Sequence, residues 1–88
     1  MQHQKTTVKA KDGLHARPVG EIVRTVKSFP GTTVALSTET KKVNAASMIG
    51  ILSLGLKAGS EVTVEAEGPD EVRALADVIA IIESSQTA

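Results

Sequence analysis

The chain has 88 residues, 41% of them hydrophobic and only one of them aromatic, and its ten basic side chains balance ten acidic ones. This length fits one domain, residues 1–88, while zero net charge and the lack of aromatic side chains disfavour binding of nucleic acid. Without cysteine, a signal peptide or an apolar run of the ~20 residues that span a bilayer, the sequence excludes disulfides and membrane insertion and predicts a soluble, cytoplasmic protein.

The N-terminal third predicts a strand followed by a helix. KTTVKAK, residues 5–11, has the two-residue period of a half-buried strand. Apolar residues then recur every three or four positions over 16–29, which predicts an amphipathic helix with Pro18 in its first turn, where a missing N–H group costs nothing. Gly20 should weaken this helix by roughly 1 kcal/mol relative to alanine. The inward stripe consists of Val19, Ile22, Val23, Val26 and Phe29.

The middle third predicts a hairpin and a short helix. Pro30-Gly31 ends the first helix, and TTVALST, residues 32–38, is rich in strand-forming residues. A second short strand, KVN at 42–44, follows a polar turn. Ser47 then caps a short helix that ends near Gly55 and is apolar nearly all round.

The last third predicts one strand and one helix. EVTVEAE, residues 61–67, alternates strictly between apolar and polar side chains. A turn leads into a helix whose inward stripe consists of Val72, Leu75, Val78, Ile79, Ile81 and Ile82. The order β-α-β-β-α-β-α predicts an α+β fold, with an antiparallel sheet that faces water on one side and carries helices on the other.

The stretch DGLHARPV, residues 12–19, predicts an anion site at the start of the first helix. Free N–H groups and partial positive charge at a helix N-terminus favour an anion, and Arg17 adds a permanently charged, forked donor for phosphate oxygens. Both neighbours disfavour the protonated imidazole of His15, so this ring would be neutral and nucleophilic. A loop histidine bonded to the backbone fits the same spacing, and both interpretations stay open at this point.

Neither a metal site nor a complete active site is predicted. The only other histidine, His3, lies in a polar N-terminal stretch that we expect to be frayed, and no carboxylate lies at ligand spacing from His15. The chain also lacks a carboxylate pair and a glycine-rich nucleotide loop. If His15 is a nucleophile, other proteins must supply the donor and acceptor active sites.

Three motifs, GLHARP at 13–18, VNAASMIGILSLG at 43–55 and EVTVEAEGPDE at 61–71, resemble HPr, the histidine-containing phosphocarrier of the bacterial phosphoenolpyruvate-dependent sugar phosphotransferase system (PTS). The resemblance implies an open-faced β-sandwich, a four-stranded antiparallel sheet covered on one face by three helices. It implies that enzyme I phosphorylates His15 on Nδ1, that Arg17 contacts the phosphoryl group, and that IIA domains of sugar transporters receive it. Such a chain is a carrier without a cofactor and not an enzyme.

The resemblance also assigns a regulatory serine and a docking surface. Ser47 matches the serine that an ATP-dependent HPr kinase/phosphorylase modifies in the Gram-positive type of HPr, which brings in a catabolite-control transcription regulator as a further partner. Its alternative role is an ordinary helix cap. A short apolar helix cannot bury every side in a small domain, so part of it should be exposed near His15. The implied docking residues are Arg24, Lys27, Met48, Ile49, Ile51 and Leu52.

Two further functions are kept as alternatives to the sugar-system carrier. A regulatory paralogue, such as one of the nitrogen-related PTS branch, would pass phosphate as a signal rather than for transport. A catabolite-repression regulator would act by binding through Ser47, but that paralogue lacks the active histidine, so the presence of His15 counts against it. A carrier that meets successive partners gains from fast release, and we expect it to be a monomer.

Overall fold

A computed structural model describes residues 1–9 and 16–84, and the order of its elements is the predicted β-α-β-β-α-β-α. The four strands are β1 (Gln2–Thr7), β2 (Thr33–Ser37), β3 (Lys42–Asn44) and β4 (Glu61–Glu67). The three helices are α1 (Ala16–Lys27), α2 (Met48–Leu52) and α3 (Glu71–Ser84). The predicted bounds of β3 and β4 are confirmed, because a hairpin partner and a strict alternation defined them locally.

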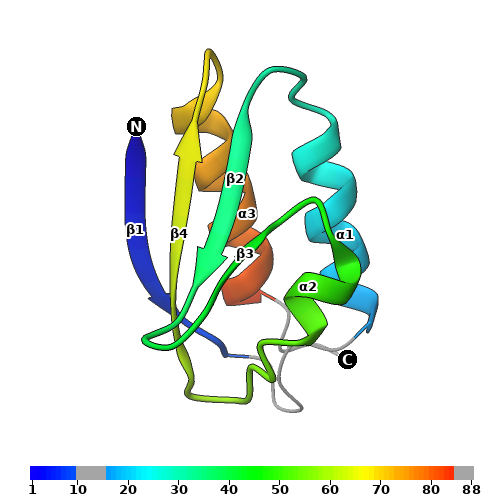
Figure 1. Cartoon of the computed structure of the whole chain (residues 1–88), viewed down its shortest axis with the longest axis vertical. Helices are drawn as coiled ribbons and strands as arrows, with labels where there is room; N and C mark the ends of the chain where they lie inside the picture. The colour runs from blue at the N-terminus through cyan, green and yellow to red at the C-terminus, as the bar shows by residue number, and fades with distance from the viewer. Residues whose placement is uncertain (10–15, 85–88) are drawn as a thin grey trace.

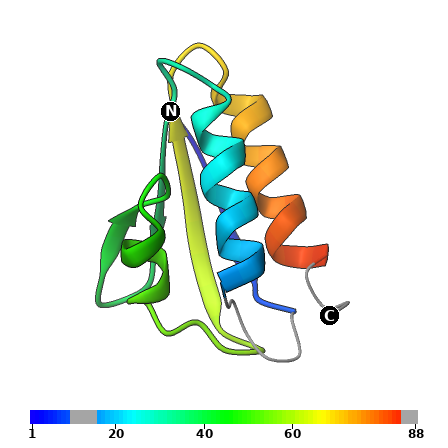
Figure 2. The same ribbon diagram turned by 90° about the vertical axis from the view of Figure 1, so that its right-hand side faces the viewer.

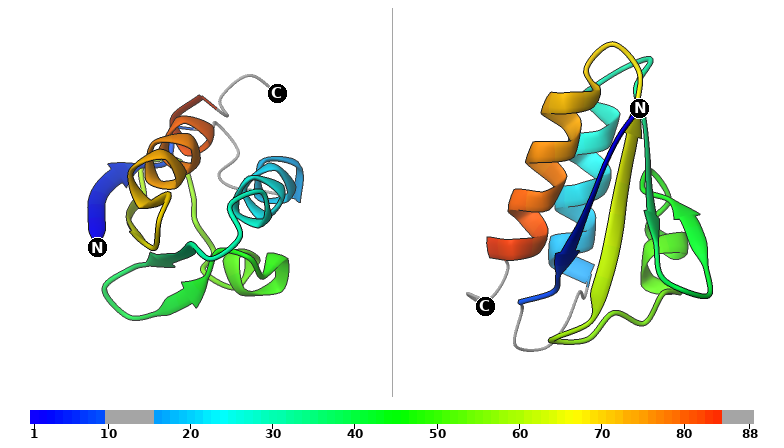
Figure 3. Two further views of the ribbon diagram at one scale, coloured as in Figure 1. Left: turned by 90° about the horizontal axis from the view of Figure 1, so that it is seen from above. Right: turned by 90° about the vertical axis from the view of Figure 1, so that its left-hand side faces the viewer.

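The strands form one antiparallel sheet in the order β1-β4-β2-β3 (Figure 1). Central β4 is paired on both sides, so that Val64 faces Gln4 of β1 and Leu36 of β2. Helices α1 and α3 lie side by side against one face of the sheet, and α2 lies next to α1 at the β3 edge (Figure 2). No described helix covers the other face (Figure 3). The predicted four-stranded sheet with three helices is confirmed.

The core lies between the sheet and its helices. The largest fully buried side chains include Ile22 of α1, Leu36 of β2 and Ile82 of α3.

The inward stripe predicted for 16–29 is confirmed as far as α1 extends, because Val19 and Val26 are also buried and Val23 packs against the core. The helix ends at Lys27 rather than at 29, and Phe29 packs against the core from the turn that follows. Helix α1 and strand β4 therefore bury the faces that their periods predict.

Strand β1 differs from its prediction, because it covers Gln2–Thr7 rather than 5–11. The polar start has no apolar alternation of its own, but it pairs along β4, with Gln2 opposite Ala66. Buried Thr6 adds a hydrogen bond from its Oγ1 to Oε2 of Glu83 in α3, at 2.5 Å. His3 consequently lies in a paired strand opposite Glu65, and the prediction of a frayed tail was wrong.

One residue of the stripe predicted for α3 faces the solvent. Val72 is 65% exposed, whereas Ala74, Val78 and Ile82 are fully buried. These three follow one another at intervals of four, and at 100° per residue Val72 lies almost opposite Ala74. The sequence pattern does not decide whether the side of α3 that carries Val72 or the side that carries Ala74 faces the core. Packing against the sheet buries the side that carries Ala74.

Gly68 lies where the turn after β4 crosses the turn before β2. Its φ is +144°, and an ideal Cβ there would lie 2.6 Å from the Gly31 carbonyl oxygen and from the Thr32 Cα. The buried Thr32 accepts a hydrogen bond at Oγ1 from the Asp70 N–H, at 3.0 Å. A side chain is therefore excluded at Gly68 both by the backbone conformation and by the contact.

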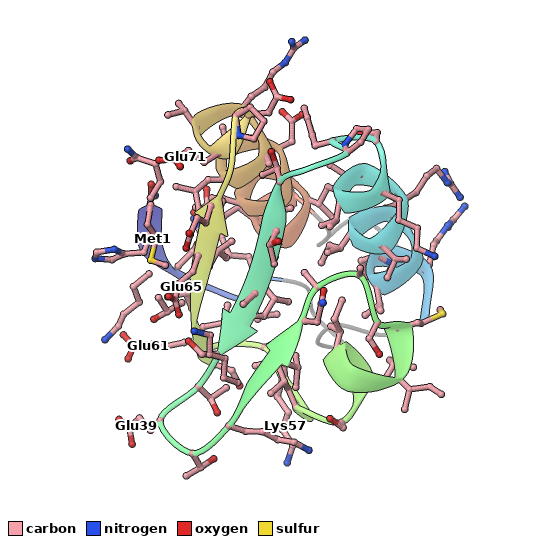
Figure 4. All side chains as sticks on the ribbon, turned by 45° about the horizontal axis from the view of Figure 1, so that its top comes forward. Met1, Glu39, Lys57, Glu61, Glu65 and Glu71 are labelled. Atoms are coloured by element: carbon pink, nitrogen blue, oxygen red, sulfur yellow. The ribbon has the colours of Figure 1, made fainter. Side chains whose placement is uncertain are left out.

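Glu71, the first residue of α3, links this helix to Gly68 and to Met1 at the same end of the molecule. Its Oε1 accepts a hydrogen bond from the Gly68 N–H at 3.2 Å, and its Oε2 lies 3.1 Å from the Met1 ammonium (Figure 4). The Gly68 hydrogen bond, followed by the Met1 ammonium, lowers the pKa of the Glu71 carboxyl. The carboxylate thus connects β1 with α3.

Candidate functional site

His15 lies outside the described residues. The described part of the candidate site begins with α1, the helix that follows His15 in the chain. Helix α1 begins at Ala16 and has no acidic residue in its first turn, so nothing there cancels the positive end of the helix dipole. Arg17 is exposed in this turn, and Pro18 is buried within it. The predicted start of the helix and the predicted position of Pro18 are confirmed.

Ser47 is the N-cap of α2, as the sequence predicts. Its Oγ accepts a hydrogen bond from the Gly50 N–H at 3.1 Å, and its side chain is exposed. At the other end of the helix, Ser53 donates to the Gly50 carbonyl at 2.6 Å and accepts from Lys41 Nζ at 2.9 Å. The hydroxyl groups of two serines therefore form hydrogen bonds at the two ends of this short helix, and Ser47 is exposed to solvent.

An exposed apolar surface covers α2 and is called the α2 patch. It consists of Met48, Ile49 and Leu52, which are 39%, 82% and 42% exposed. Ile51 is 1% exposed, so its prediction as a docking residue was wrong. On a helix with 100° per residue, Ile51 lies almost opposite Ile49, and the side that carries Ile51 packs into the core.

Exposed cations on α1 form a basic stripe beside the α2 patch. The basic stripe consists of Arg17, Arg24 and Lys27. Intervals of three and four residues place them on the same side of α1 as Gly20, and an ideal Cβ at Gly20 would lie 4.0 Å from Met48 Cε. The side of α1 that carries the basic stripe therefore approaches the α2 patch at Gly20 and Met48, and a rim of Arg24 and Lys27 around the patch stays a prediction. The spacing of the sequence alone also places Gly20 between Arg17 and Arg24 on this side of the helix.

Alanine variants of the two isoleucines of α2 should separate folding from docking. We expect Ile51→Ala to lower the free energy of unfolding by about 2–5 kcal/mol, because it removes buried methyl and methylene groups and leaves a cavity. Ile49→Ala should change it by less than about 0.5 kcal/mol, because that side chain is in water. Urea denaturation of both variants measures the difference. Equal losses of stability would show that the assignment of the two sides is wrong.

The opposite face of the sheet carries paired charges rather than an anion site. Lys5 lies 3.9 Å from Glu61 and Lys42 lies 3.3 Å from Glu65, and Figure 4 shows both glutamates on β4.

Within residues 1–9 and 16–84, no group of three or more potential ligand side chains could hold a metal ion. The described helices include none with the length and apolar character needed to cross a membrane.

Comparison with known proteins relates the whole arrangement to one family. A family model described as the PTS HPr component phosphorylation site matches residues 2–84. The chain is 41% identical to the HPr-like protein Crh of Bacillus subtilis over 83 residues, which cover 94% of this chain and 96% of that protein. It matches the crystal structure of HPr-C-His from Thermoanaerobacter tengcongensis with a TM-score of 0.90 and 39% identity, over 100% of this chain and 98% of that one. A crystal structure of Bacillus subtilis Crh, described as a dimer with a swapped domain, matches with a TM-score of 0.76 and 39% identity over the full length of both chains.

Proposed function

Because the chain belongs to the HPr family, we propose that it is a PTS phosphocarrier that accepts a phosphoryl group on Nδ1 of His15 from phospho-enzyme I and passes it to IIA domains of sugar transporters. The family match over residues 2–84 is the observation that carries this proposal. The carrier works in the cytoplasm as a single HPr domain over 1–88, uses no cofactor and depends on its partners for catalysis. Its monomeric state stays a prediction.

In this proposal the helix start serves both the free and the phosphorylated states. A neutral His15 attacks phosphorus with its Nδ1 lone pair, and the bond between phosphorus and enzyme I breaks as the new N–P bond forms. The added negative charge is then stabilised by Arg17 and by the free N–H groups in the first turn of α1. The same groups repel a proton on the free imidazole, so they keep it nucleophilic.

Docking of both partners is proposed for the α2 patch and the basic stripe. A central apolar surface with cations at its rim suits a partner that presents apolar side chains among carboxylates. We assign contact roles to Arg24 and Lys27 on α1 and to the three residues of the α2 patch. Ile51 supports this surface from the core side.

The proposal is tested by incubating the full chain with phosphoenolpyruvate, Mg²⁺ and enzyme I. We expect a phosphate that is labile in acid and stable in base, as phosphohistidine is, and that moves onto a IIA domain when one is added. A wild-type chain that takes up no acid-labile phosphate would rule out the carrier function.

Ser47 is proposed as a regulatory site for HPr kinase/phosphorylase, read by a catabolite-control transcription regulator. Its hydroxyl is exposed next to Met48 and Ile49, so a phosphate there changes the docking surface without entering the core. We expect ATP and the kinase to produce an acid-stable phosphate that is lost in Ser47→Ala and kept in Ser53→Ala. Undiminished labelling of Ser47→Ala would leave the serine with its capping role alone.

The similarity to Crh favours a second candidate function, a regulatory HPr paralogue that acts by phosphorylation-dependent protein binding. Its nitrogen-branch form would pass phosphate from His15 as a signal. The two labelling experiments separate these candidates. Labelling on Ser47 alone identifies a binding regulator, whereas labelling on His15 with transfer to a sugar IIA domain identifies the transport carrier.

A further inference from the structure

We propose that the chain binds a small polyhydroxylated molecule with one ammonium group, such as an amino sugar, in a hollow on the helix-free face of the sheet. The hollow has a volume of about 760 Å³ and lies between β1, β4, the β2–β3 turn and the segment that leads into β4. None of the described residues that line it belongs to a helix. The inference goes beyond the proposed function and does not depend on it.

The floor of the hollow consists of polar side chains in two rows across the sheet. Lys5 of β1 lies opposite Thr63 of β4, which in turn lies opposite Ser37 of β2. Thr7 and Glu61 form the next row. Alternation with buried neighbours along each strand turns these side chains away from the helices. Because adjacent strands lie about 4.7–4.9 Å apart, one row can bond different groups of a single ring-sized ligand.

Hydroxyl groups dominate the lining of the hollow. Within the described part of the chain, the hydroxyls of three half-buried residues, Thr7, Ser37 and Thr63, have no hydrogen-bond partner. Ser60 Oγ accepts a hydrogen bond from the Lys57 N–H at 3.0 Å and keeps its own O–H group to donate. Since buried polar groups are normally paired, these hydroxyls favour a ligand that carries several hydroxyl groups of its own.

The charged side chains of the hollow select a cationic ligand. Glu39 and Glu61 supply two carboxylates and Lys5 supplies one ammonium, so the lining carries one net negative charge. Lys5 Nζ lies 3.9 Å from Glu61 Oε1, whereas Glu39, in the β2–β3 turn, has no ion pair within the described residues (Figure 4). A ligand ammonium can therefore pair with Glu39, while a phosphate ester would be repelled. Leu54 and Leu56 add an apolar wall for the C–H groups of a sugar ring.

Backbone hydrogen bonds hold both walls of the hollow without a ligand. In the β2–β3 turn, the Thr38 N–H donates to the Lys41 carbonyl at 2.8 Å. The segment that leads into β4 is joined to Val8, whose N–H donates to the Ser60 carbonyl and whose carbonyl accepts from the Gly59 N–H, both at 2.8 Å. The hollow is thus preformed, and binding does not have to order these segments.

NMR titration of the isotope-labelled chain tests the ligand class at about pH 6, where the amine of glucosamine is protonated and glutamates are ionised. We expect glucosamine to shift the amides that line the hollow in a saturable way, with a millimolar Kd because the hollow is open to solvent. N-acetylglucosamine lacks the ammonium group and cyclohexylamine lacks the hydroxyl groups, and each should bind about fivefold more weakly or less tightly still. A phosphate ester of glucosamine should not saturate.

Variants with matched controls test the assigned residues. Thr63→Val removes a hydroxyl from the floor and keeps its shape, and it should raise the Kd for glucosamine about fivefold. Thr33→Val removes an exposed hydroxyl from the same face outside the hollow and should keep the wild-type Kd. Glu39→Gln should abolish the preference for glucosamine over N-acetylglucosamine, whereas Glu67→Gln, also outside the hollow, should keep it.

Urea denaturation checks that each variant folds. Shifts that grow linearly with glucosamine, or that map to other residues, would overturn the inference. Equal affinity for glucosamine and either of the two comparison ligands would overturn it too, as would equal losses in Thr63→Val and Thr33→Val. Enzyme I should phosphorylate Thr63→Val like the wild type, because the hollow lies on the helix-free face, so failure of the carrier function leaves the titration valid.

Discussion

Replacing His15 by alanine is expected to abolish the acid-labile phosphate that the chain accepts from phosphoenolpyruvate and enzyme I. The chain has two histidines, and only His15 directly precedes α1, whose N-terminus and Arg17 favour a phosphoryl group. His3 lies opposite Glu65 in β1, where alternation with buried Thr6 places it on the helix-free face. His3→Ala should therefore keep wild-type labelling and is the matched control.

Radiolabelling followed by acid and base treatment distinguishes the two variants, and peptide mass spectrometry under basic conditions locates the phosphate. Urea denaturation should give the same stability for His3→Ala and wild type to within about 0.5 kcal/mol, because the side chain is exposed. Acid-labile phosphate on His15→Ala would show that another residue accepts the phosphoryl group. Loss of label in a folded His3→Ala would give His3 a role that its place in β1 does not predict.

Gly68→Ala is expected to have the largest effect on stability among the glycine variants, lowering the free energy of unfolding by about 3 kcal/mol or more. The new Cβ would meet the backbone of Gly31 and Thr32 at 2.6 Å, and the φ of +144° would add conformational strain. Relief of the contact must separate the two turns and weaken the hydrogen bond between Asp70 and Thr32. Thermal unfolding measures the loss, since each kcal/mol shifts the melting temperature by about 4–8 °C in a domain of this size.

Gly55→Ala is the control that separates backbone strain from the contact. Gly55 also has a positive φ, +61°, but an ideal Cβ there meets nothing within 4 Å. Its replacement should cost only about 1–2 kcal/mol, the penalty of a left-handed conformation. Similar losses in the two variants would mean that the crossing of the turns adapts to a side chain and contributes little to stability.

The elements that local patterns define could be predicted from the sequence. Strand β4 alternates strictly, and Ser47 caps α2 through a contact three residues away, at the Gly50 N–H. Strand β1 could not be delimited, because its polar residues become a strand by pairing with residues some sixty positions later. The bounds of β1 are set by its pairing with β4 rather than by a pattern in its own sequence.

The candidate site shows the same division between local and tertiary information. The position of Arg17 near the helix start and the exposure of Met48 and Ile49 follow from spacing and from the small size of the core. The burial of Ile51 does not follow, because an all-apolar helix carries no pattern that selects its inner side. Contact with the core makes that selection, as it does for Val72 in α3.

The pairing of β1 with β4 has a consequence for synthesis on the ribosome. Strand β1, Gln2–Thr7, finds its sheet partner in Glu61–Ala66, which is synthesised some sixty residues later. Helix α1 and the β2–β3 hairpin can form earlier, because their contacts are local. The nascent chain therefore carries β1 without its sheet partner until β4 emerges and joins β1 to β2, and the core stays uncovered until α3, which follows β4, packs against the sheet.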